Sequence, residues 1–63
     1  MKDGEKYICE IKAIYGNGSY IETLTYDGYH DGFFHLGAFF SMSNPKQNRL
    51  TVLRKADENE WIS

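Results

Sequence analysis

The chain has one cysteine, one proline and no long apolar run, and each scarcity excludes a class of protein. A single cysteine, Cys9, cannot form an internal disulfide or a four-cysteine zinc site. No stretch has the ~20 apolar residues of a membrane span, and the start MKDGEKY lacks the apolar core of a signal peptide. We therefore expect one domain over residues 1–63, in a reducing and cytoplasmic compartment.

Positive charge is also missing from half of the chain. Between Ala13 and Pro45 there is no lysine or arginine, yet eight of the ten aromatic residues lie there. Soluble proteins normally spread charge over their surface and expose few aromatic rings. This apolar, mildly acidic half favours a protein-recognition surface over a phosphate-binding one. Its acidic members are Glu22, Asp27 and Asp31.

Alternation of apolar and polar residues predicts β-strands in three segments. Residues 6–15 alternate, Gly16-Asn17-Gly18-Ser19 is typical of a tight hairpin, and residues 20–26 form the returning strand. Residues 49–55 predict a further strand, and the tail can add a closing strand through Trp61 and Ile62. One face of the first strand carries its apolar side chains, namely Tyr7, Cys9, Ile11, Ala13 and Tyr15.

The segment 33–40 (FFHLGAFF) fits a strand or a helix. Gly37 disfavours the helix by about 1 kcal/mol and the paired phenylalanines favour a strand, so we expect a strand with a possible helical turn near residues 39–43. Neighbours in a strand face opposite ways, which places Phe33 and Phe39 outside. The predicted fold is all-β: a small, single-domain, four- to five-stranded antiparallel barrel, SH3-like or OB-like.

Four short motifs occur in a familiar order: Gly16-Asn17-Gly18, Glu22, Asp27-Gly28 and His35-Leu36-Gly37. In this order the chain resembles the OB-fold barrels of bacterial translation initiation factor one, its eukaryotic counterpart factor 1A, and the S1 type. The resemblance implies a barrel that binds RNA. In that family a basic segment follows the glycine and contacts ribosomal RNA. The corresponding residues of this chain are Ala38-Phe39-Phe40-Ser41-Met42, so those cations are missing.

Cys9, His30, Asp31 and His35 are the residues that invite a catalytic or metal-binding interpretation. Cys9 lies on an apolar strand face, where a thiol is usually an inert small hydrophobe. His30 and His35 are an odd number of residues apart, so on one regular strand they would face opposite sides. We therefore expect neither an enzyme nor a metal site, and no cofactor.

The remaining interpretation is a non-enzymatic module that binds a larger protein, whose surface would be basic. Small phage and mobile-element inhibitors of host enzymes are of this size. The predicted contacts are Tyr26, Asp27, Tyr29, Asp31, Phe33, His35 and Phe39. The alternative is single-stranded RNA or DNA binding through Lys46, Arg49, Arg54 and Lys55. A homodimer that buries the aromatic face is a third hypothesis.

Overall fold

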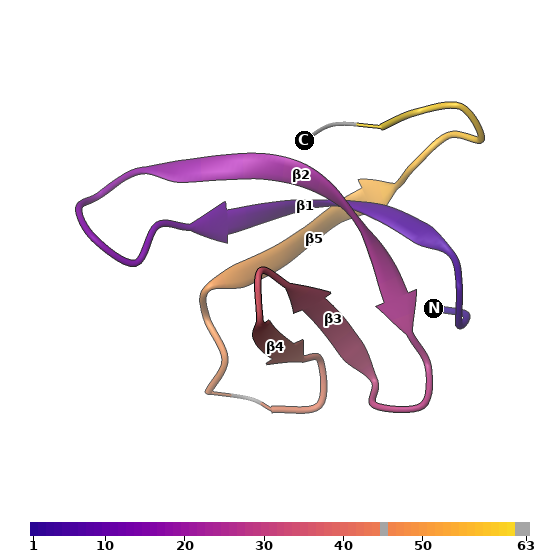
Figure 1. The fold of residues 1–63 in the computed structure, drawn as a ribbon, viewed down its shortest axis with the longest axis horizontal. Coiled ribbons are helices and arrows are strands. Elements are labelled where there is room, and N and C mark those ends of the chain that lie inside the picture. The colour runs from indigo at the N-terminus through magenta and orange to yellow at the C-terminus, as the bar shows by residue number, and fades with distance from the viewer. Residues whose placement is uncertain (45, 62–63) are drawn as a thin grey trace.

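The chain forms five antiparallel strands in one sheet (Figure 1). The structure is a computed structural model that describes residues 1–44 and 46–61. Within those residues there is no helix, so the all-β prediction is confirmed. The strand order is β4-β3-β2-β1-β5, which makes a barrel-like sheet that is not closed. The strands are β1 (Lys6–Lys12), β2 (Ser19–Asp27), β3 (Gly32–His35), β4 (Ala38–Ser41) and β5 (Leu50–Lys55).

Strand β2 belongs to two ladders. Its residues from Ser19 to Thr25 pair with β1, and its last two, Tyr26 and Asp27, pair with β3. Figure 1 shows β2 running from the long β1–β2 hairpin on the left down to the β3–β4 hairpin below. The N-terminal segment continues the first ladder, because the Gly4 amide donates to the Tyr26 carbonyl (2.9 Å). The small hairpin is thus joined to the rest of the sheet by two residue pairs.

The core lies on the inner face of the bent sheet. Three aromatic rings, those of Tyr7, Tyr26 and Phe33, meet edge to face with centroids 5.5 to 6.4 Å apart. Such contacts add to the stabilisation from apolar burial. The predicted inward face of the first strand is confirmed for Tyr7, Cys9 and Ile11. The other buried members of the core are Leu24, Phe40 and Leu50.

The first predicted strand ends earlier than the alternation indicated. β1 stops at Lys12, and a six-residue loop, 13–18, precedes β2. Gly16 has a positive φ of 87°, and the Ala13 amide donates to the Gly18 carbonyl across the loop (2.9 Å). The prediction that Tyr15 faces the core is therefore wrong, since its side chain is 90% exposed in that loop.

The segment 33–40 is a hairpin and not one strand. Leu36 and Gly37 have φ of 49° and 81°, the positive values of a two-residue primed turn. The predicted helical turn near residues 39–43 is wrong, because β4 continues to Ser41 before the chain turns. The turn also reverses the predicted orientation of Phe33. Phe33 lies opposite Phe40, and cross-strand partners share a face, so both are buried together.

The tail after β5 is held by an ion pair. Arg54 donates to both carboxylate oxygens of Glu60, and the Asp57 amide donates to Glu60 Oε1 (3.0 Å). Trp61 lies outside every strand, so the predicted closing strand is wrong at that residue, and Ile62 lies outside the described residues. The described part of the chain offers no helix of the length and apolarity that crossing a membrane requires.

Candidate functional site

The outer face of the β3–β4 hairpin carries an exposed aromatic pair. Phe34 and Phe39 are cross-strand partners, and their ring centroids are 4.6 Å apart. Their side chains are 55% and 39% exposed, although the same strands bury Phe33 and Phe40 on the other face. Large apolar side chains grouped on a surface are typical of an interaction site.

His30 completes this pair from the β2–β3 turn. Its ring meets Phe34 and Phe39 edge to face, at centroid distances of 5.7 and 6.1 Å. Asp27 fixes the turn, because its Oδ1 accepts from the Tyr29 amide (2.9 Å) and its Oδ2 lies 2.9 Å from His30 Nδ1. The contact with His30 lowers the pKa of Asp27. We call His30, Phe34 and Phe39 the outer aromatic cluster.

Gly32 lies beneath the Phe39 ring of the outer aromatic cluster. A Cβ at Gly32 would lie 2.5 Å from Cζ of Phe39 and 2.3 Å from the Phe40 carbonyl oxygen. The Phe39 ring therefore lies directly over the Gly32 backbone, where no side chain fits. This packing explains why Phe39 is less exposed than Phe34 and holds its ring in one orientation.

Two further large side chains, in the turns on either side of β3, are exposed. Tyr29, in the β2–β3 turn, is 91% exposed, and Leu36, at the tip of the β3–β4 hairpin, is 89% exposed. Leucine is rare at positive φ, where its Cβ crowds the backbone. An exposed apolar residue in a strained turn position points to a use outside the folding of the chain.

The predicted contact residues divide between the surface and the core. Phe39 belongs to the cluster, Asp27 contacts its His30, and Tyr29 is the exposed chain neighbour of His30. Phe33 is fully buried and Tyr26 nearly so, so neither ring is available to a partner, and Phe34 takes the outward position predicted for Phe33. Asp31 accepts a short hydrogen bond from the Tyr26 hydroxyl, which raises the pKa of Tyr26 to about 12.

His35, the remaining predicted contact, points inward and away from the cluster. Its Nε2 lies 2.9 Å from Glu22 Oε2, and its ring is 6.0 Å from that of Tyr20. Glu22 and His35 stand at the edge of a hollow of about 460 Å³ between β2, β3 and the tail. The lining residues are Glu22, Thr23, Leu24, Thr25, Phe34, His35 and Trp61.

The candidate catalytic residues do not converge. Cys9 is fully buried, and burial raises the pKa of its thiol to about 11, which disfavours the nucleophilic thiolate. Over residues 1–44 and 46–61, no group of three or more His, Cys, Asp or Glu side chains is placed to hold a metal ion. These two findings therefore do not point to any particular reaction.

The predicted nucleic-acid contacts are largely engaged within the chain. Arg54 pairs with Glu60, and Lys55 pairs with Glu5. The Arg49 guanidinium lies over the Phe40 ring, 5.3 Å from its centroid. Lys46 and Arg49 do line a shallow groove together with Phe39 and Phe40. Two of the four cations are therefore neutralised, and two lie near aromatic side chains.

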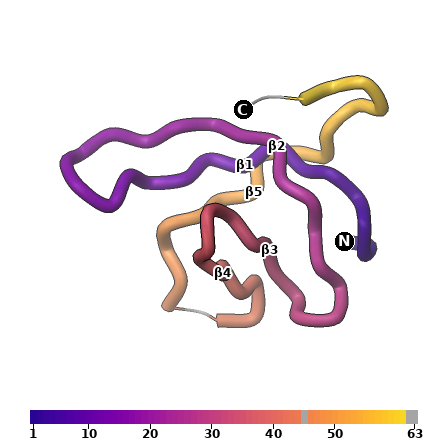
Figure 2. The backbone as a smooth tube through the Cα atoms, viewed as in Figure 1, coloured from indigo at the N-terminus to yellow at the C-terminus, as the bar shows by residue number. Residues whose placement is uncertain are grey.

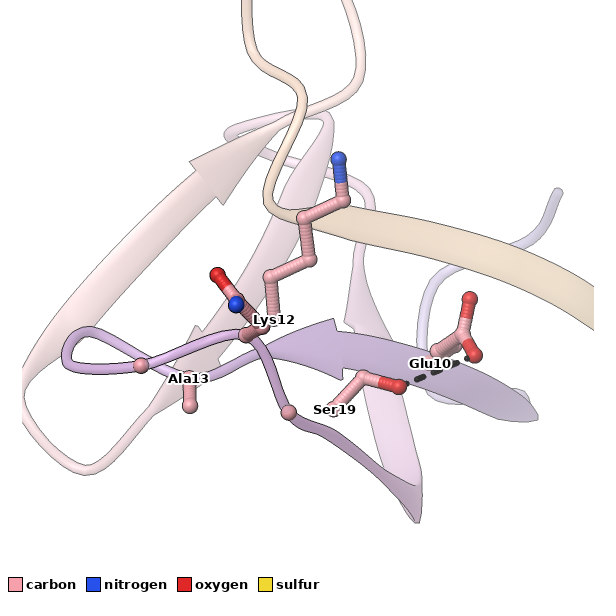
Figure 3. Close-up of a pocket in the computed structure, with 7 residues that line it drawn as sticks. Glu10, Lys12, Ala13 and Ser19 are labelled. Carbon is pink, nitrogen blue, oxygen red and sulfur yellow. Dashed lines mark hydrogen bonds between the residues drawn. The ribbon is translucent and has the colours of Figure 1, made fainter.

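A further hollow, of about 320 Å³, lies at the β1–β2 hairpin (Figure 3). Figure 3 shows the Glu10 carboxylate turned toward Ser19, whose hydroxyl donates to it (3.2 Å), while the Lys12 side chain extends separately. The rest of the lining is Ala13 and the turn residues 16–18. It has no aromatic or apolar group larger than alanine, so it has little to hold a ligand.

Comparison with known proteins gives no match: no family model, no curated protein and no solved structure matches this chain. The site is therefore interpreted from its own chemistry. Sequence reasoning missed Phe34 and Leu36 as surface residues, and did not include His30 among the predicted contacts. The near-symmetric FFHLGAFF, with Gly37 in its centre, is the signal that indicates a hairpin there.

Proposed function

We propose that this chain is a non-enzymatic protein-binding module that docks its outer aromatic cluster on a larger protein. The single observation that carries the proposal is the Phe34–Phe39 pair, exposed and in ring contact on a hairpin whose opposite face is core. Ring pairs fixed by their own packing lose little entropy on binding, and aromatic anchors dominate interface energetics.

The partner surface is proposed to be apolar with a basic rim. Asp27, at the end of β2, contacts His30 of the cluster, Asp31 follows His30 in the chain, and the stretch 13–45 has no lysine or arginine. Complementary charge at the rim steers association and selects partners. The nearest cations, Lys46 and Arg49, lie on the side of the groove beyond Phe39.

The test compares single alanine variants at exposed aromatic positions. Phe34→Ala and Tyr29→Ala remove side chains of the proposed surface, and Tyr15→Ala is the matched control because Tyr15 is equally exposed on the distant β1–β2 loop. The tagged chain captures proteins from its native host's lysate after nuclease treatment. Captured proteins are identified and purified, and their affinity for each variant is measured directly.

We expect one protein whose purified form binds the wild type and Tyr15→Ala alike, and the Phe34 variant about tenfold or more weakly. Equal binding to all variants would overturn the proposal. Sedimentation of the chain at several concentrations is done first, because a dimer through the same face would compete with the partner.

Single-stranded nucleic acid remains a second candidate for one specific reason. Lys46 and Arg49 share a groove with Phe39 and Phe40, and aromatic platforms beside cations stack bases. Binding of a fluorescent oligonucleotide that weakens steeply with added salt, and is lost in Lys46→Ala, would favour this candidate. No response to salt would leave protein binding as the proposal.

A further inference from the structure

We propose that the hollow between β2, β3 and the tail receives a lysine or arginine side chain of the partner protein. This inference rests on the proposed function and adds to it the chemistry of one contact. It is carried by the pairing of Glu22 with His35 at the edge of the hollow, and by the aromatic side chains of Phe34 and Trp61 in its lining.

Glu22 and His35 lie close together without forming a hydrogen bond. His35 Nε2 is buried and lies 2.9 Å from Glu22 Oε2, but within the described residues it makes no hydrogen bond. The Glu22 carboxylate has more acceptor sites than one imidazole can use, whichever ring nitrogen carries the proton. An ammonium or guanidinium placed beside it would donate to the remaining sites in a charge-assisted hydrogen bond.

Glu22, like Asp27 beside His30, is paired with an imidazole and not with a lysine or arginine. Glu5 has Lys55, and Glu60 has Arg54, whereas Glu22 has only the imidazole of His35 within salt-bridge distance. Its side chain is half-buried, so its charge is less screened than that of a fully exposed carboxylate. The site thus has a negative charge that no lysine or arginine of the described residues compensates.

The rest of the lining suits the stem of such a side chain. Leu24, Phe34 and the methyl groups of Thr23 and Thr25 give the hollow apolar walls. Lysine and arginine bury an aliphatic stem and keep a charged head. Aromatic rings that face a cation add attraction when water is displaced. The hollow has about 460 Å³, a volume typical of ligand pockets.

The position of the hollow links it to the outer aromatic cluster. Phe34 lines the hollow and also stacks with Phe39 and His30. A partner that covers the cluster therefore has the hollow at its border. Figure 2 shows the tail on the β2 side of the molecule. Trp61, in this tail, lines the hollow together with residues of β2 and β3.

The experiment titrates small probes into the protein without any partner. N-acetyl-lysine methylamide and N-acetyl-arginine methylamide carry the proposed group, and N-acetyl-norleucine methylamide is the uncharged match of the lysine probe. Fluorescence of Trp61, the one tryptophan of the chain, and NMR shifts of His35 report binding. Glu22→Gln removes the charge with little change of shape. Glu10→Gln is the control, since it removes the same charge on the opposite face of the sheet.

We expect saturable shifts with the cationic probes, with affinity on the order of millimolar, about tenfold weaker in Glu22→Gln and unchanged in Glu10→Gln. Equal response to norleucine, or no effect of Glu22→Gln, would overturn the inference. So would a doubly protonated His35 ring at pH 7.5, because Glu22 would then already be neutralised. None of these outcomes touches the proposed function, which is tested by Phe34→Ala and Tyr29→Ala against the partner itself.

Discussion

Phe33 and Phe40 lie opposite each other on β3 and β4, and both rings enter the core. Their chain neighbours Phe34 and Phe39 form the next pair of the ladder and point outward. Two of the four phenylalanines of this hairpin therefore pack in the core, and the other two lie on the protein surface. The pairs differ in what they stabilise, and this difference can be measured.

Replacing Phe33 and Phe34 by alanine should have unequal effects on stability. Phe33→Ala removes a fully buried ring and should cost about 3–5 kcal/mol, which is comparable to the total stability of a domain of this size. Phe34→Ala removes an exposed ring and should cost about 1 kcal/mol or less. Urea unfolding followed by circular dichroism checks this, and equal losses would contradict the assigned faces.

Leu36 should be a destabilising residue in the wild-type chain. Its φ of 49° is costly for leucine, and asparagine adopts this region readily. We expect Leu36→Asn to stabilise the protein by about 1 kcal/mol. Leu53→Asn is the control, because Leu53 is also exposed but lies in β5. A gain of stability in both variants would mean that the exposure of an apolar leucine, and not the positive φ of Leu36, destabilises the wild-type chain.

Gly32 should not accept even a methyl group. An alanine Cβ would lie 2.3 Å from the Phe40 carbonyl oxygen, and a backbone atom cannot move aside without breaking the β3–β4 ladder. We expect Gly32→Ala to cost about 1–3 kcal/mol. Gly18→Ala is the control, since its Cβ would contact nothing within 4 Å. Thermal melts of both variants decide the matter, and equal melting temperatures would contradict the packing of Phe39 on Gly32.

Cys9 should react with thiol reagents only when the protein opens. The side chain is fully buried, and its pKa is raised to about 11, so accessible thiolate is scarce at neutral pH. We expect slow labelling that accelerates with urea in parallel with unfolding, and fast labelling of a cysteine introduced at Tyr15. Rapid modification of Cys9 in the folded protein would show that β1 is open to solvent.

Acid should weaken the contacts that hold the two ends of the chain. Hydrogen bonds from Lys55 to Glu5 and from Arg54 to Glu60 lower the pKa of each carboxyl from 4.5 to about 2. A lowered pKa in the folded state means stability that is present above pH 4.5 and lost as the pH falls toward 2.

The variants Glu5→Gln and Glu60→Gln should therefore be less stable at neutral pH and less sensitive between pH 4.5 and 2. Glu58→Gln serves as the control, because no ion pair of the described residues includes it. Urea midpoints measured across this range test the expectation. An unchanged pH dependence in both variants would mean that other groups govern acid unfolding. Since both pairs are partly exposed, added salt should reduce the difference.

Much of the fold could be predicted from alternation alone. It predicts the places of β1, β2 and β5 along the chain, and the inward positions of Tyr7, Cys9 and Ile11 are those that the pattern indicates, although Ile8 between them is buried as well. Gly16-Asn17-Gly18 indicates the reversal between β1 and β2, although Ile14 and Tyr15 lie in the loop. Apolar residues in an exposed loop follow no periodic rule, which is why the end of β1 was predicted wrongly.

The candidate site was harder to predict, because it depends on one turn. Leu36 is an unusual residue for a primed turn, so the eight residues 33–40 were interpreted as one strand. That interpretation inverts the faces on one side of the turn: a straight strand places residues 33 and 40 on opposite faces, whereas the hairpin places them on one. The contacts of His35 with Glu22 and of Trp61 with the hollow join segments far apart in sequence, and no local pattern encodes them.

The β3–β4 hairpin also has a consequence for how this chain can diversify. Its inward residues, 33 and 40, meet the core, and its outward residues, 34 and 39, meet none of it. Substitutions at the outward positions can therefore change the shape and chemistry of the exposed surface while the folded scaffold persists. In the proposed function, the residues that contact the partner and the residues that keep the chain folded are therefore different side chains of the same hairpin.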